Sequence, residues 1–349
     1  MTSPTGPSTP TTGAPPARAT PPVLALPGVT PELAVRLQDG LARVDSLILA
    51  TVDHDDPLIA HAAGHLASAG GKRVRPLLSL LAAELGSGIS DDVVVAAAGV
   101  ELTHLASLYH DDVMDEADVR RGVSSANALY DNSTAILVGD LLFGKASELI
   151  ADLGPQAVKI QAHTFVRLCG GQIRDDRPTP ADADPVAYYL GVLADKTGAL
   201  IATAARYGAM FGGCDEQVVS LVTSYGEELG IAFQLADDLI DISSQADETG
   251  KTPGTDLREG KRTLPVLHAL ATTDGAGARL RELLESDLHD EPALAEALGL
   301  LRTHPALARA RAETQEVGRA AAARLDPLPV SDARTALQTL VISVTDRVG

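Results

Sequence analysis

The chain has 349 residues, of which 45% are hydrophobic and 3% aromatic, and its formal net charge at pH 7 is −19. This acidic balance argues against nucleic-acid binding and against adhesion to anionic lipid by charge alone. Charged residues interrupt the apolar stretches, so we expect no membrane span. The two cysteines, Cys169 and Cys214, are too few for a disulfide framework and favour a reducing, cytoplasmic location.

Residues 1–28 are rich in Pro, Thr, Ser and Ala, and we predict a disordered tail without the hydrophobic region of a secretory signal. From residue 29 to 349, Ala, Leu, Glu and Arg recur with a period near 3.6. This pattern predicts one all-α domain, a bundle of ten or more antiparallel helices. The breaks between helices are predicted at residues 53–57, 69–73, 86–90, 121–124, 152–155, 175–185, 212–215, 243–261, 272–275 and 326–331.

A basic turn at residues 70–76 comes first along the chain. Its sequence is Gly-Gly-Lys-Arg-Val-Arg-Pro, so two glycines precede three cations and the start of a helix. Glycines let the backbone approach a phosphate closely, and a helix N-terminus is electropositive. An exposed basic turn with no ligand would have the same sequence.

Two acidic clusters of identical form follow apolar helices. The first contains Asp111, Asp112 and Asp115, and the second contains Asp237, Asp238 and Asp241. Positions i, i+1 and i+4 bring three carboxylates within about one helical turn, where they repel unless a cation lies between them. Oxygen ligands of this kind suit Mg²⁺, which also binds water and substrate phosphates. A lone copy would more often be a solvated helix end, but both clusters follow stretches that are apolar on nearly every side and therefore buried.

Several further polar groups lie near these clusters in sequence. Arg120 and Arg121 can bind phosphate bidentately, or form a surface ion-pair network with the first cluster. His104 lies two helical turns before Asp111, where a histidine is more often a core residue than a ligand. Lys196 is predicted within a helix spanning residues 187–208, from which it could simply extend to solvent. The long loop at 250–265 carries four cations, and such loops are often functional lids.

The ordered set of motifs resembles the trans-type isoprenyl diphosphate synthases, or polyprenyl synthetases, over residues 30–345. The motifs are GGKRVRP, ELTHLASLYHDDVMDEADVRRG, DKTG, FQLADDLID and GKTPGTDLREGKRTLP. The resemblance implies an isoprenoid synthase fold with a central cavity and a cytoplasmic homodimer. It also implies condensation of isopentenyl diphosphate with an allylic diphosphate, assisted by three Mg²⁺ ions, with Mn²⁺ as a possible substitute. Release of the product could require membrane or detergent.

Site residues are implied by the same resemblance. Asp111, Asp115 and Asp237 match metal ligands, and Asp112, Asp238 and Asp241 complete the clusters directly or through water. The allylic diphosphate would be bound by Arg120, Lys196 and Lys251, and isopentenyl diphosphate by Lys72, Arg75, His104 and Arg121. Thr197 and Gln234 match polar residues near the reacting carbons, so Lys196, Thr197, Gln234 and Arg120 form the expected catalytic group. Lys261 belongs to the family's flexible loop.

Product length depends on residues one turn before the first cluster. Ala106 and Ser107 lie about 6–7.5 Å along the helix axis from Asp111. Short-chain members of the family commonly carry an aromatic residue there, so these small side chains predict a product of more than four isoprene units. A floor could instead lie deeper, at Leu102, Phe143 or Phe165.

The same motifs are compatible with other functions. They are a synthase of farnesyl or geranylgeranyl length, a non-catalytic subunit of a heteromeric synthase, a terpene cyclase and a head-to-head condensing enzyme. Gln172 stands where many relatives have Glu, which leaves substrate preference open. The second acidic cluster and the basic turn favour the linear synthase over a cyclase.

Overall fold

A computed structural model describes residues 29–243, 253–272 and 277–347. Its first half contains α1 (Pro31–Val52), α2 (Pro57–Ser68), α3 (Val74–Ala83), α4 (Asp91–Met114), α5 (Ala126–Leu129), α6 (Asn132–Asp152) and α7 (Pro155–Asp175). The second half contains α8 (Pro185–Leu193), the π-helix η2 (Ala194–Gly198), α9 (Ala199–Phe211), α10 (Glu216–Ser243), α12 (Thr255–Arg258), α13 (Leu264–Ala271), α14 (Ala278–Leu284), α15 (Glu291–Thr303), α16 (Pro305–Arg324) and α17 (Asp332–Asp346). The predicted all-α bundle is confirmed.

One small β-hairpin interrupts the described helices. Strands β1 (Val119–Arg120) and β2 (Val123–Ser124) pair antiparallel, with Arg120 opposite Val123. The predicted break at 121–124 covers only its second half. The hairpin follows the end of α4 and returns the chain toward the first acidic cluster, so it determines where Arg120 and Arg121 lie.

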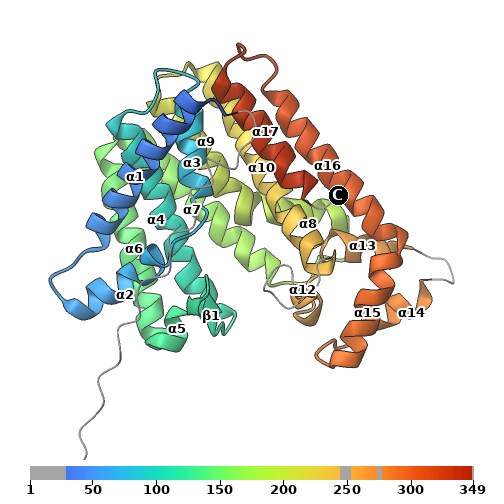
Figure 1. Cartoon of the computed structure of the whole chain (residues 1–349). Coiled ribbons are helices and arrows are strands. Elements are labelled where there is room, and N and C mark those ends of the chain that lie inside the picture. The colour runs from blue at the N-terminus through green and yellow to red at the C-terminus, as the bar shows by residue number, and fades with distance from the viewer. Residues whose placement is uncertain (1–28, 244–252, 273–276, 348–349) are drawn as a thin grey trace, which may run out of the picture.

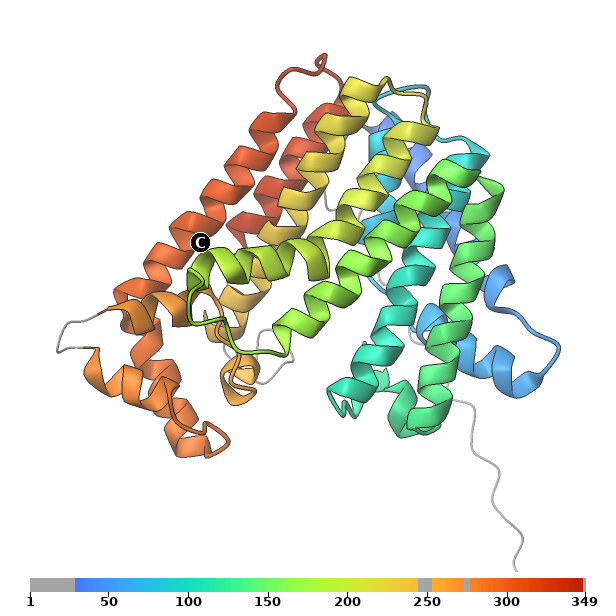
Figure 2. The same ribbon diagram turned by 180° about the vertical axis from the view of Figure 1, so that it is seen from behind.

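The two helices that carry the acidic clusters, α4 and α10, both pack against α9. Around them, α4 also packs against α3 and α6, and α10 against α16 and α17. Both views place the C-terminal ends of α4 and α10 at the same end of the bundle, near β1 and α12 respectively (Figures 1 and 2). Because each cluster lies at such an end, the fold brings both clusters to one end of the molecule.

Helix starts follow the predicted breaks because polar caps and prolines occur there. Asp56 accepts hydrogen bonds from the backbone N–H groups of Leu58 and Ile59, and Pro57 is the first residue of α2. Ser90 caps α4 in the same way through the N–H of Val93. Such caps satisfy amides that have no partner within the helix.

Helix α4 is buried along most of its length. Among the described residues it is the single helix long and apolar enough to cross a membrane, which differs from the expectation of no such stretch. However, 72% of the apolar segment of this helix is buried inside the protein. Its composition therefore reflects its position in the core between α1, α3, α6 and α9.

Candidate active site

The first acidic cluster lies at the C-terminal end of α4. Asp112 is fully buried, and one of its oxygens accepts a hydrogen bond from Arg120 Nε at 2.5 Å. Its other oxygen, Oδ2, is buried and has no hydrogen-bond partner among the described residues. Asp115, the exposed C-cap of α4, lies 3.7 Å from the Arg120 guanidinium. The cluster therefore combines one anchored carboxylate with more accessible ones.

The pKa of Asp111 reflects both its burial and the charges around it. Burial raises its pKa to about 6, the Lys196 ammonium opposes this shift, and the Asp115 carboxylate adds to it. Lys196 belongs to η2, far from α4 in sequence. Its influence on Asp111 indicates that the cation and the carboxylate share one site.

The second cluster lies at the end of α10. Asp238 is 4% exposed and accepts hydrogen bonds from the Tyr189 hydroxyl and from Gln234 Nε2, the latter at 3.1 Å. Burial raises the pKa of Asp238 to about 7, with a further contribution from the Asp256 carboxylate. By contrast, Asp237 is exposed.

Asp241 connects the second cluster to the segment that follows. Its two carboxylate oxygens accept hydrogen bonds from the backbone N–H groups of Thr255 and Asp256, each at 3.2 Å. The Asp241 backbone carbonyl accepts a further bond from Gly254 N–H at 3.0 Å. These bonds hold the start of α12 against the cluster.

The residues expected at the catalytic centre lie on and beside η2. The sequence predicts a continuous helix from 187 to 208, but the structure divides it into α8, the π-helix and α9. Short π-helices often occur at functional sites. Lys196 Nζ donates to Asp175 at 2.6 Å, and Thr197 Oγ1 donates to Gln234 Oε1 at 3.4 Å.

Two features of α7 keep η2 in place. Gly171 faces η2 so closely that a Cβ there would lie 2.4 Å from the backbone nitrogen of Lys196. Asp195 accepts hydrogen bonds from Arg167, at 2.6 Å, and from Arg174. Asp195 opens the DKTG motif, but the sequence does not show that its partners are Arg167 and Arg174. Tyr189 lies outside the motifs, and the sequence gives no sign that it donates to Asp238.

Arg121 joins the hairpin that follows the first cluster to the basic turn and to α2. This arginine donates to the carbonyl oxygens of Gly70, at 2.5 Å, and Leu66, at 3.3 Å. Arg75 Nε is buried and has no hydrogen-bond partner in the described segments. Burial, together with the charge of nearby arginines, lowers the pKa of His104 well below its usual value, so this histidine is neutral. Lys72 is exposed.

The long loop is described only in part. Lys251 lies outside the described residues. Lys261 Nζ lies 2.8 Å from Glu259. Burial lowers the pKa of this lysine, but Glu259 and Asp256 outweigh that effect and leave the pKa above its usual value.

The residues present fit a divalent cation. Within the described ranges no group of three His, Cys, Asp or Glu residues is close enough together to form a complete metal site. However, Asp112 has a buried oxygen that accepts no hydrogen bond from the described residues, and burial raises the pKa of Asp111 and Asp238. A hard cation that takes its remaining ligands from water and phosphate would compensate these carboxylates.

The two residues expected to control product length differ in accessibility. Ala106 is fully buried in the core formed by α1, α2, α4 and α6, whereas Ser107 is partly exposed. Leu102, one candidate for a deeper floor, is also fully buried in that core. Phe143 on α6 and Phe165 on α7, the other candidates, contact each other with tilted rings whose centroids are 4.4 Å apart.

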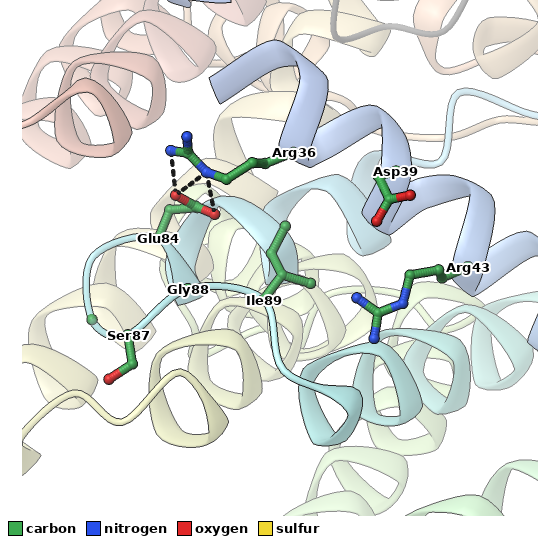
Figure 3. A pocket seen from close by; sticks show the side chains of 8 residues that line it. Arg36, Asp39, Arg43, Glu84, Ser87, Gly88 and Ile89 are labelled. Carbon is green, nitrogen blue, oxygen red and sulfur yellow. Dashed lines mark hydrogen bonds and ion pairs between the residues drawn. The ribbon is translucent and has the colours of Figure 1, made fainter. Parts of the chain in front are cut away.

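A separate pocket of about 330 Å³ lies between α1 and the turn that connects α3 to α4 (Figure 3). It adjoins the N-terminal end of α4, about 30 Å along the helix from Asp111 at 1.5 Å per residue. Its arginines are already paired, Arg36 with Glu84 at 2.6 Å and Arg43 with Asp91 at 2.5 Å. This pocket therefore lacks the uncompensated cations that a diphosphate needs.

Comparison with known proteins identifies the family. Residues 56–301 match the polyprenyl synthetase family. The chain belongs to this family. This polyprenyl synthetase is 46% identical over 317 residues to nonaprenyl diphosphate synthase of Mycobacterium tuberculosis, covering 90% of the chain and 95% of that relative. It is therefore a prenyltransferase.

Solved structures agree with this assignment. Geranylgeranyl pyrophosphate synthase from Corynebacterium glutamicum, complexed with calcium and isoprenyl diphosphate, matches this polyprenyl synthetase with a TM-score of 0.83 and 43% identity, covering 92% of the chain and 98% of that structure. Decaprenyl diphosphate synthase from Rhodobacter capsulatus matches with a TM-score of 0.83 and 36% identity, covering 91% and 99%.

Proposed function

We propose that this polyprenyl synthetase condenses isopentenyl diphosphate head to tail with an allylic diphosphate, giving an all-trans product of more than four isoprene units. Such products form quinone side chains. The observation that carries the proposal is the presence of two different groups that can hold a diphosphate, one through metal ions and one directly. One is the acidic pair of clusters with Lys196, and the other is the basic turn with Arg75 and Arg121. Two diphosphate substrates require two such groups.

The acidic clusters and nearby cations would bind the allylic substrate. Asp111, Asp115 and Asp237 would hold up to three Mg²⁺ ions, or Mn²⁺, with Asp112, Asp238 and Asp241 assisting directly or through water. When bound, these ions neutralise the charge that develops on the departing diphosphate. Arg120 and Lys196 would contact the same diphosphate, together with Lys251 and Lys261 from the long loop. Lys196 would exchange its contact with Asp175 for the substrate.

The basic turn would bind the second substrate. Lys72, Arg75 and Arg121 would contact the diphosphate of isopentenyl diphosphate, and neutral His104 would donate a hydrogen bond to it without adding charge. Thr197 donates a hydrogen bond to Gln234, and both side chains would orient the reacting carbons. The released diphosphate would accept the final proton. Apolar helix walls would keep water from the allylic cation.

Support for a long product comes from two sources. Ala106 and Ser107 are small, and two of the similar proteins are named as nonaprenyl and decaprenyl diphosphate synthases. The alternative is a product of farnesyl or geranylgeranyl length, because one geranylgeranyl pyrophosphate synthase is 43% identical in sequence to this chain.

A homodimer in the cytoplasm is the assembly we propose. Helices α6 and α7 are neighbours (Figure 2) and together expose Ile136, Leu137, Val158, Val166 and Ile173. An exposed apolar band of this kind supports burial against a second copy of the chain. Sedimentation velocity would give the mass of a dimer, whereas the mass of a monomer would exclude it.

The activity is tested by incubating the purified chain with Mg²⁺, radiolabelled isopentenyl diphosphate and farnesyl diphosphate. Linear diphosphates longer than four isoprene units support the proposal. Products that stop at four units or fewer support the shorter synthase, and a cyclic hydrocarbon supports a cyclase. Activity that requires a second protein indicates a subunit of a heteromeric enzyme. Detergent in the assay separates slow product release from slow condensation.

A further inference from the structure

Glu101 is a buried carboxylate beside the basic turn. It begins the motif that contains the first acidic cluster, but the resemblance assigns no role to it. It lies on α4, is 1% exposed, and precedes His104 by three residues, so both side chains lie on one face of the helix. A buried carboxylate destabilises the fold unless it is paired, and the Oε1 atom of Glu101 accepts a hydrogen bond from Arg73 at 2.9 Å.

Arg73 links Glu101 to the backbone of the basic turn. It is the N-cap residue of α3 and has a left-handed backbone with φ of 47°, a strained conformation for a non-glycine residue. Its guanidinium also donates to Asp45 Oδ1 at 2.8 Å and to the Ala67 carbonyl oxygen at 2.9 Å. Three bonds to α1, α4 and the end of α2 therefore hold the turn in a conformation it would not adopt alone.

Glu101 also acts on the cations that face the proposed substrate. Burial lowers the pKa of both Arg75 and Arg121, and the negative charge of Glu101 opposes this shift. The Arg121 guanidinium lies against Gly71, about 3.0 Å from where a Cβ would be. Without a nearby negative charge, the three guanidinium groups of Arg73, Arg75 and Arg121 would repel one another before any substrate arrived.

We propose that Glu101 is the positioning residue of the isopentenyl diphosphate pocket. Through Arg73 it fixes the turn that presents Lys72 and Arg75, and it keeps Arg75 and Arg121 together in the absence of substrate. Glu101 itself does not contact the substrate. This inference rests on the proposed function, because it assigns the basic turn to isopentenyl diphosphate.

Glu101→Gln tests this role with little change in shape. We expect the KM for isopentenyl diphosphate to rise about tenfold or more, the effect of losing one charge-assisted interaction in a preorganised pocket. The KM for farnesyl diphosphate and kcat should change less than about threefold. Calorimetric titration with isopentenyl diphosphate alone should show the same weakening, and it does not depend on turnover.

Asp45→Asn is the matched control. It removes the other carboxylate that binds Arg73, but Asp45 is 44% exposed, so water can replace it. We expect this variant to leave the KM for isopentenyl diphosphate within about threefold of the wild-type value. If Glu101→Gln does not fold, Arg73→Lys replaces it. Lysine keeps the charge, but its single nitrogen cannot reach the three separate acceptors that the Nε, Nη1 and Nη2 atoms of Arg73 reach, and the same selective rise in KM is expected.

Three results would overturn the inference. A lower KM for isopentenyl diphosphate would mean that Glu101 only repels the substrate. Equal changes in both KM values, or a lower melting temperature with unchanged KM values, would mean that Glu101 has a purely structural role. Wild-type protein in the same assay separates the two hypotheses: if it forms no prenyl diphosphate, the proposed function fails, whereas an active wild type with an unaffected variant rejects the role of Glu101.

Discussion

Asp112 and Asp238, the middle aspartates of the two clusters, are both buried and both hydrogen-bonded to another segment. They are 0% and 4% exposed, and each accepts a hydrogen bond from another segment, Asp112 from Arg120 and Asp238 from Tyr189. The first cluster's Asp115 and the second cluster's Asp237 are exposed. Each cluster thus has an anchored carboxylate beside accessible ones, an arrangement suited to holding cations at a helix end.

Loss of one carboxylate should affect turnover more than stability. For Asp111→Asn and for Asp237→Asn we expect kcat to fall by roughly a hundredfold or more, because charge on the departing diphosphate is no longer neutralised. The melting temperature without metal should stay the same or rise in Asp111→Asn, since burial already disfavours the charged carboxylate. Asp152→Asn, an exposed position at the end of α6, is the control. A marked drop in the metal-free melting temperature would point to a structural role.

The free energy of unfolding should fall as pH rises in the metal-free protein, and a bound metal ion should reverse the direction of this dependence. The folded-state pKa values of Asp111 and Asp238, about 6 and about 7, lie above those of unfolded aspartate. The folded protein therefore binds more protons than the unfolded chain between about pH 4 and pH 7, so these groups lower the metal-free stability as pH rises through that window. A bound cation favours the deprotonated carboxylates, so its stabilising effect should grow from pH 5 to pH 8.

Melting temperatures with and without Mg²⁺ and inorganic diphosphate measure this effect. In Asp238→Asn the metal-free stability should decline less between pH 5 and pH 8 than in the wild type. An equal pH dependence in variant and wild type would show that Asp238 does not contribute to it.

Ser107→Phe should shorten the product. Ser107 is partly exposed one turn before Asp111, so an aromatic ring there would close the path of the growing tail. We expect products of farnesyl or geranylgeranyl length. Ala106→Phe should act in the same direction, but this position is fully buried and neighbouring side chains must move. Chromatography of dephosphorylated products measures chain length. Ser147→Phe, on an exposed position of α6, is the control, and an unchanged length in both test variants would reject this path.

Gly171→Ala tests the placement of η2. The added methyl group would approach the Lys196 nitrogen to 2.4 Å and displace the π-helix. We expect a loss of about 1–3 kcal/mol in stability and a roughly tenfold to hundredfold fall in kcat, because Lys196 and Thr197 would move. Gly170→Ala adds the same methyl group with no atom within 4 Å and should be nearly neutral. Equal activity of the two variants would contradict this account.

The sequence predicts the helices well and the site only in part. Polar and proline breaks mark helix ends such as Val52 and Pro57, because caps and fixed backbone angles act locally. The sequence does not predict the π-helix, since this element depends on Gly171 and Gly230 allowing α7 and α10 to approach η2. Nor does the sequence predict the roles of Glu101 and Tyr189. Their importance depends on partners that are distant in sequence, and only the folded chain brings these together.

The most direct test of the metal-binding account is a crystal structure with Mn²⁺ and a non-reactive allylic diphosphate analogue, with the ions located by anomalous scattering. Mn²⁺ should lie between the ends of α4 and α10, coordinated by Asp111, Asp115 and Asp237 and by the analogue's diphosphate. Manganese and diphosphate bound elsewhere, with these aspartates directed into solvent, would contradict it.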